Sequence, residues 1–171
     1  MEQFSFLDNW QIHKATGIAQ EGLHSIKVNN LKGMNLKIYL SKSYNRMSWL
    51  YIQMLLTHIG FYNDFINWIM CCITSVSYRI LINGSITIFF HVEHGILQGC
   101  ALSPLLFLLV MEGLSRLLTN ERNQGIFKGV KILANIVLSH LLFIDDVLIF
   151  LSGAIRYTIA LKNILKKIVR L

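Results

Sequence analysis

The stretch Ser139–Leu151, Ser-His-Leu-Leu-Phe-Ile-Asp-Asp-Val-Leu-Ile-Phe-Leu, decides how this chain is expected to fold. It places two adjacent carboxylates, Asp145 and Asp146, between the apolar runs Leu141–Ile144 and Val147–Leu151. Runs this short and this aliphatic predict buried strands rather than helices. A polar pair between two strands predicts a hairpin tip that reaches water. A polar turn is the simplest interpretation. A divalent-cation site is the alternative, because neighbouring carboxylates repel each other.

The composition of the 171 residues is unusually apolar, with 54% hydrophobic and only 15% charged residues. The formal net charge of +7 suits a polyanionic partner. The three cysteines have neither zinc-ligand nor disulfide-framework spacing. We recognise neither a signal peptide nor an apolar run of the ~18 residues that a membrane span needs. We therefore expect one intracellular domain, in the cytoplasm or nucleus, with no membrane contact and no inferable obligate protein partner.

Apolar periodicity and turn residues predict a mixture of helices and strands. The expected helices are Ile12–Lys27, Trp49–Ile59, Asp64–Thr74, Leu105–Leu118 and Ala154–Val169. Alternating apolar residues predict a strand over Gly33–Leu40, and Asn83-Gly84 predicts a hairpin joining Tyr78–Ile82 to Ser85–Phe90. Ser103 is expected as the N-cap of a buried helix, with Pro104 at its first position. This order of elements predicts an α+β fold.

Four segments resemble the reverse transcriptase domain of non-LTR (LINE-type) retrotransposons, most like those of plants. Phe143-Ile144-Asp145-Asp146 is similar to the family's F/Y-x-D-D motif. Residues 95–104, Gly-Ile-Leu-Gln-Gly-Cys-Ala-Leu-Ser-Pro, are similar to its G-x-x-Q-G-x-x-L-S-P motif. Tyr78–Ser85 and Met111–Arg116 resemble further stretches. The resemblance covers nearly all of the chain and implies an RNA-directed DNA polymerase, with an RNA template, a DNA primer and deoxynucleoside triphosphates as its partners.

The resemblance also implies a fold. The family's palm is an antiparallel sheet backed by helices, and residues 34–171 are expected to form it together with an inserted fingers-like segment. Residues 1–33 are expected to be a fingers-like remnant. We expect the endonuclease domain, the thumb and the last palm segment to be missing from these 171 residues, so the chain should bind duplexes weakly. The surfaces that these parts cover in the family would then be bare and apolar.

By resemblance, the active site holds two Mg²⁺ ions that activate the primer 3′-oxygen and stabilise the leaving pyrophosphate. Asp145 is the essential member of the carboxylate pair, and Asp146 stands beside it. Gln98 and Gly99 would line the nascent base pair. Tyr44 would wall off the 2′-position of the incoming sugar, although a packed core aromatic is the alternative interpretation.

The chain departs from the family where the other carboxylate is expected. The family reads L-D-x-S-K-A-Y-D-R-V-x-W, and residues 38–49 read Ile-Tyr-Leu-Ser-Lys-Ser-Tyr-Asn-Arg-Met-Ser-Trp, so the two acidic positions are Tyr39 and Asn45. A phenol with a pKa near ~10 is a poor Mg²⁺ ligand. The family's triphosphate-contacting arginine falls on Trp10. We therefore expect a degenerate site with polymerase activity lost or severely impaired. The alternative is a non-catalytic nucleic-acid-binding remnant that uses its basic surface alone.

Overall fold

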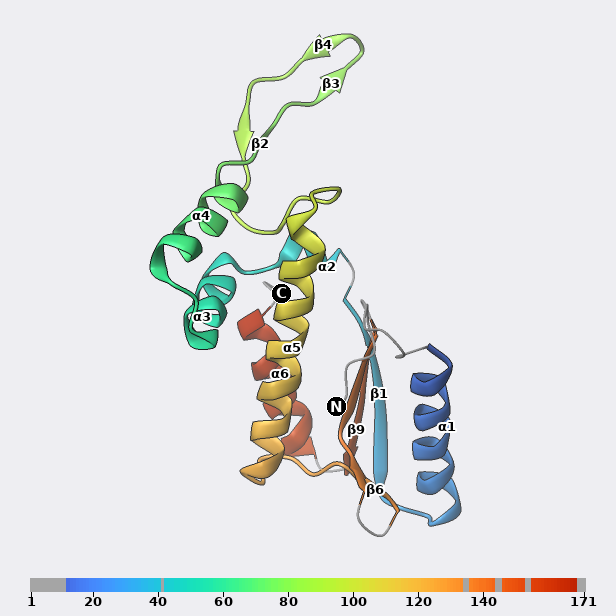
Figure 1. Ribbon diagram of the computed structural model, residues 1–171. Helices are drawn as coiled ribbons and strands as arrows, with labels where there is room; N and C mark the ends of the chain where they lie inside the picture. The colour runs from blue at the N-terminus through green and yellow to red at the C-terminus, as the bar shows by residue number, and fades with distance from the viewer. Residues whose placement is uncertain (1–11, 41, 134–135, 144–145, 153–154, 169–171) are drawn as a thin grey trace. The chain divides into compact units, whose positions relative to one another are not determined.

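The computed structural model describes residues 12–40, 42–133, 136–143, 146–152 and 155–168. The chain divides into two compact units, and Figure 1 shows their helices and strands. Unit 1 comprises residues 1–41 and 111–166, and unit 2 comprises residues 42–110 and 167–171.

A three-stranded antiparallel sheet forms the centre of unit 1. Its strand order is β1 (Gly33–Tyr39), β9 (Asp146–Ser152) and β8 (His140–Phe143). β8 and β9 form the predicted hairpin, in which Phe143 pairs with Asp146, while residues 144–145 between them lie outside the described residues. Leu142 and Val147 are fully buried, which confirms the prediction of two buried strands. β1 pairs with β9 over its whole length.

Helices lie on both faces of this sheet (Figure 1). On one face, α1 (Ile12–Val28) contributes Ala15 to a core cluster with Leu141 and Phe150. Gly22 lets α1 pack closely against Leu138, because a Cβ at position 22 would lie only 2.8 Å from a methyl group of that residue. The opposite side carries α6 (Ile155–Ile168) and the second half of α5 (Leu102–Asn123). The predicted N-terminal and C-terminal helices are thereby confirmed.

Unit 1 also contains a hairpin that the sequence did not predict. β6 (Val130–Leu133) pairs with β7 (Ile136–Leu138), and the register shifts between Lys131 and Leu133. No strand was predicted for residues 130–138. A nearly continuous apolar run has neither a period of two nor a strong turn residue, so periodicity does not reveal the hairpin.

Three helices begin unit 2: α2 (Ser43–Arg46), α3 (Trp49–Ile59) and α4 (Asn63–Thr74). α3 and α4 match the predicted helices, and α2 was not among them. Gly60 ends α3 in the left-handed conformation, with φ 96°, and its N–H donates to the carbonyls of Leu56 and Thr57. This is the conformation that glycine adopts at a helix end without steric strain.

An exposed arm follows α4 (Figure 1). β2 (Ser77–Tyr78) pairs with β5 (Phe90–His91), and β3 (Leu81–Ile82) pairs with β4 (Ser85–Ile86). Asn83 and Gly84 have φ values of 48° and 83°, as the predicted two-residue hairpin turn requires. The predicted strands Tyr78–Ile82 and Ser85–Phe90 are longer than the observed ones, because the pairing is interrupted between the β2–β5 sheet and the β3–β4 sheet.

α5 begins three residues before the predicted start at Leu105, so Ser103 lies inside the helix instead of capping it. The Ser103 hydroxyl donates to the carbonyl of Leu97. Phe107 and Leu114 are fully buried, as expected of a buried helix, but Leu105 is 60% exposed. Within the described residues, α5 alone is long and apolar enough to cross a membrane, and half of that segment is buried. Soluble core helices share these features, and the absence of a membrane span stays a prediction.

Candidate functional site

The structure brings Tyr39 and Asp146 together. They are direct partners in the antiparallel pairing of β1 with β9. Side chains directly opposite in such a pair lie on the same face with Cβ atoms about 5 Å apart. Tyr39 is 65% exposed, so its ring lies on the surface of unit 1 instead of in the core. Asp145 lies outside the described residues.

Asp146 already has a cationic neighbour. The Lys37 ammonium lies 3.2 Å from Oδ2 of Asp146. Lys37 is two residues before Tyr39 on β1 and pairs with Leu148, so it reaches Asp146 diagonally across the ladder. No role was predicted for Lys37 from the sequence. The contact was missed because it depends on the register between strands more than 100 residues apart in the chain.

The described part of Asp146's environment does not fit the family's two-metal site. Magnesium takes a near-octahedral set of oxygen ligands, supplied in such sites by carboxylates, phosphate and water. Here a phenol stands opposite the Asp146 carboxylate and an ammonium binds it. Among the residues that the structure describes, no group of three or more His, Cys, Asp or Glu side chains is placed to hold a metal ion.

Tyr44 lies in unit 2, where its ring stacks on Phe107 with centroids 4.8 Å apart and planes inclined by 10°. Its backbone carbonyl accepts a hydrogen bond from the N–H of Ile96 at 2.7 Å. Tyr44 is therefore held both by a ring contact and by its main chain. This contact agrees with the interpretation of Tyr44 as a packed core aromatic. The role of Tyr44 beside the 2′-position of the incoming sugar stays a prediction.

Gln98 and Gly99 are exposed in the loop that precedes α5. Gly99 has φ 87° and open space around its Cα, so the backbone conformation alone favours glycine there. Gly95, the first glycine of the same motif, has φ 91° and abuts Asn45, whose carbonyl oxygen would lie 2.7 Å from an added Cβ. Glycine is thus favoured at these two positions for different structural reasons. The contacts of Gln98 and Gly99 with the nascent base pair stay a prediction.

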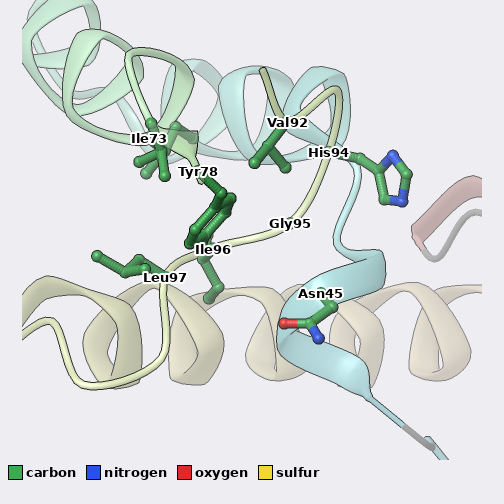
Figure 2. A pocket seen from close by; sticks show the side chains of 9 residues that line it. Asn45, Ile73, Tyr78, Val92, His94, Gly95, Ile96 and Leu97 are labelled. Atoms are coloured by element: carbon green, nitrogen blue, oxygen red, sulfur yellow. The ribbon is translucent and has the colours of Figure 1, made fainter. Parts of the chain in front are cut away.

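A small pocket of about 100 Å³ lies beside Gly95 and is lined by Asn45, Tyr78, His94 and apolar neighbours (Figure 2). None of its lining residues is acidic. Nδ1 of His94 is buried and has no hydrogen-bond partner among the described residues. Asn45, the second acidic position of the family pattern, therefore lies beside an apolar pocket and a histidine of unit 2.

A buried polar network in unit 1 was not foreseen from the sequence. Nε2 of His140 lies 2.9 Å from the Ser115 hydroxyl of α5, and its Nδ1 lies 3.0 Å from the Ser139 hydroxyl. Arg122 of α5 donates to that same Ser139 oxygen at 3.1 Å. His140 and Ser139 are fully buried. The network joins α5 to β8, the first strand of the Asp145-Asp146 hairpin. Its only sequence signal was a histidine next to an apolar run.

Comparison with known proteins identifies the family. The family described as reverse transcriptase (RNA-dependent DNA polymerase) matches residues 1–171. The chain belongs to the reverse transcriptase family. As a member of this family it is related to enzymes that transfer nucleotidyl groups, and the predicted fold class, an antiparallel sheet with helices on its faces, is confirmed.

Two solved telomerase structures share the fold of this reverse transcriptase domain. Telomerase from Candida albicans, in complex with a TWJ fragment of telomeric RNA, superposes with a TM-score of 0.59 and 12% identity. That match covers 95% of this chain and 29% of the telomerase chain. Apo telomerase from Candida tropicalis, truncated from the C-terminal domain, gives a TM-score of 0.57 at 15% identity and covers 96% and 32% of the two chains. The domain thus spans less than a third of each telomerase chain.

Proposed function

We propose that this domain derives from the reverse transcriptase of a plant-type non-LTR (LINE-type) retroelement and that its polymerase activity is lost or severely impaired. The observation that supports the loss is the pairing of Tyr39 with Asp146. The family's strand carboxylate would stand at Tyr39, and the described chain offers no other acid there.

The ancestral reaction joins a deoxynucleotide to a DNA primer on an RNA template, with Mg²⁺ as the cofactor that carboxylates hold. In this proposal, Asp145 and Asp146 are the remaining ligands, and Tyr44, Gln98 and Gly99 are the remaining nucleotide and template contacts. Because the described residues around Asp146 do not fit a metal ion, we expect the chain to retain parts of the nucleic-acid surface without the chemistry.

Primer extension on an RNA template with the full 171-residue chain tests the loss. We expect no extension by the natural chain in Mg²⁺ or Mn²⁺. Extension by Tyr39→Asp, alone or with Asn45→Asp, would show that the rest of the site is intact. Tyr62→Asp is the matched control, because Tyr62 is 88% exposed in unit 2 and has no proposed role. Extension by the natural chain at a rate typical of the family would refute the proposal.

The net charge of +7 supports a second candidate, a non-catalytic nucleic-acid-binding module. Its signature is retention of an RNA–DNA hybrid that weakens steeply with salt and is unaffected by Asp145→Ala. This candidate fails if the chain does not retain the hybrid at low ionic strength.

A further inference from the structure

Lys37 and Asp146 form an ion pair on the face of unit 1 that also carries Tyr39. Nζ of Lys37 lies 3.2 Å from Oδ2 of Asp146, and the two side chains are 63% and 43% exposed. The strand register makes the pair possible, since Lys37 and Tyr39 are alternate residues of β1 and therefore project from the same face.

An ammonium and a divalent cation compete for the same carboxylate oxygens. A tethered ammonium has the advantage of proximity, and a metal ion has the advantage of higher charge and of several simultaneous ligands. An exposed ion pair is weak and does not by itself exclude a metal from a complete set of carboxylates. At Asp146, however, the direct cross-strand partner is the phenol of Tyr39, which is a poor metal ligand. The ammonium of Lys37 is therefore favoured over a metal ion as the partner of this carboxylate.

We propose that Lys37 is the resident counter-ion of Asp146 and that it sets the affinity of this carboxylate for divalent cations. The inference rests on the proposed loss of function and extends it, because it names a second residue that opposes metal binding. Replacing Tyr39 by aspartate restores one carboxylate but leaves the Lys37 ammonium on the carboxylate of Asp146. Lys37 then still competes with a metal ion for Asp146.

A titration of the full chain with Mn²⁺ at low ionic strength tests this inference. Binding is measured as the loss of the electron paramagnetic resonance signal of free Mn²⁺. We expect Lys37→Gln combined with Tyr39→Asp to bind Mn²⁺ about tenfold more tightly than Tyr39→Asp alone. Lys37→Arg combined with Tyr39→Asp should stay as weak as Tyr39→Asp. The matched control is Lys131→Gln combined with Tyr39→Asp, which removes the same charge from an exposed lysine on β6.

Equal Mn²⁺ affinities of the Lys37→Gln and Lys131→Gln double variants would overturn the inference, as would one-to-one Mn²⁺ binding by the natural chain. The readout is metal binding, so it is independent of primer extension, which tests the loss of function.

Discussion

Replacing His140 by leucine should destabilise unit 1, because the hydroxyl groups of Ser115 and Ser139 lose their hydrogen bonds to the histidine. The change keeps the side-chain volume similar, so a cavity contributes little. Ser115, only 7% exposed, loses the hydrogen bond to Nε2 of His140, and a buried hydroxyl without a partner raises the folded-state free energy by about 1–3 kcal/mol. Ser139 loses one bond, worth about 0.5–1.5 kcal/mol, but keeps Arg122. The sum is about 1.5–4.5 kcal/mol.

Urea unfolding at neutral pH, followed by circular dichroism, measures this loss as a lower midpoint. With a denaturant dependence of about 2 kcal/mol/M, the midpoint should fall by about 1–2 M. The decisive comparison is the double variant Ser115→Ala/His140→Leu. It removes the orphaned hydroxyl, so it should be more stable than His140→Leu alone by about 1 kcal/mol. Asn120→Ala, at an exposed position of the same helix, measures the separate gain in helix propensity.

The refuting result is additivity. If Ser115→Ala destabilises the His140→Leu background as much as it destabilises the natural chain, then Ser115 does not depend on His140. The network would then not join α5 to β8 in the way that its distances indicate.

Three further predictions concern stability in the same assay. Gly95→Ala should lower the free energy of unfolding by more than Gly99→Ala, which should cost about 1 kcal/mol, because both residues have positive φ but only Gly95 abuts a backbone carbonyl; equal losses would contradict this. Leu142→Ala should cost about 2–5 kcal/mol, whereas the control Leu81→Ala, 68% exposed in the arm, should cost less than about 0.5 kcal/mol. Burial raises the pKa of Tyr51 to about 12. Its unfolded form therefore ionises first, and stability should fall as the pH rises from 10 towards 12, a slope that Tyr51→Phe should reduce.

Local sequence signals predicted the elements whose conformation depends on near neighbours. Asn83-Gly84 adopts the two positive φ values that its turn requires, and α3 ends at Ile59 as predicted, with Gly60 following in the left-handed conformation. The same reasoning failed for β6 and β7, because an apolar run without alternation is compatible with several structures. Sequence reasoning also placed Ser103 at the N-cap of α5, whereas Ser103 lies inside the helix and its hydroxyl donates to the carbonyl of Leu97.

The sequence by itself determined the family and the hairpin around Asp145 and Asp146, because short motifs and apolar runs are local properties of the chain. Only the tertiary structure decided what surrounds Asp146. The pairing of β1 with β9 sets Tyr39 directly opposite that carboxylate and brings the Lys37 ammonium to 3.2 Å from it. The physical reason is register. The alternation of apolar residues in β1 indicates that Lys37 and Tyr39 share a face, but it does not specify which residues of β9 lie opposite them.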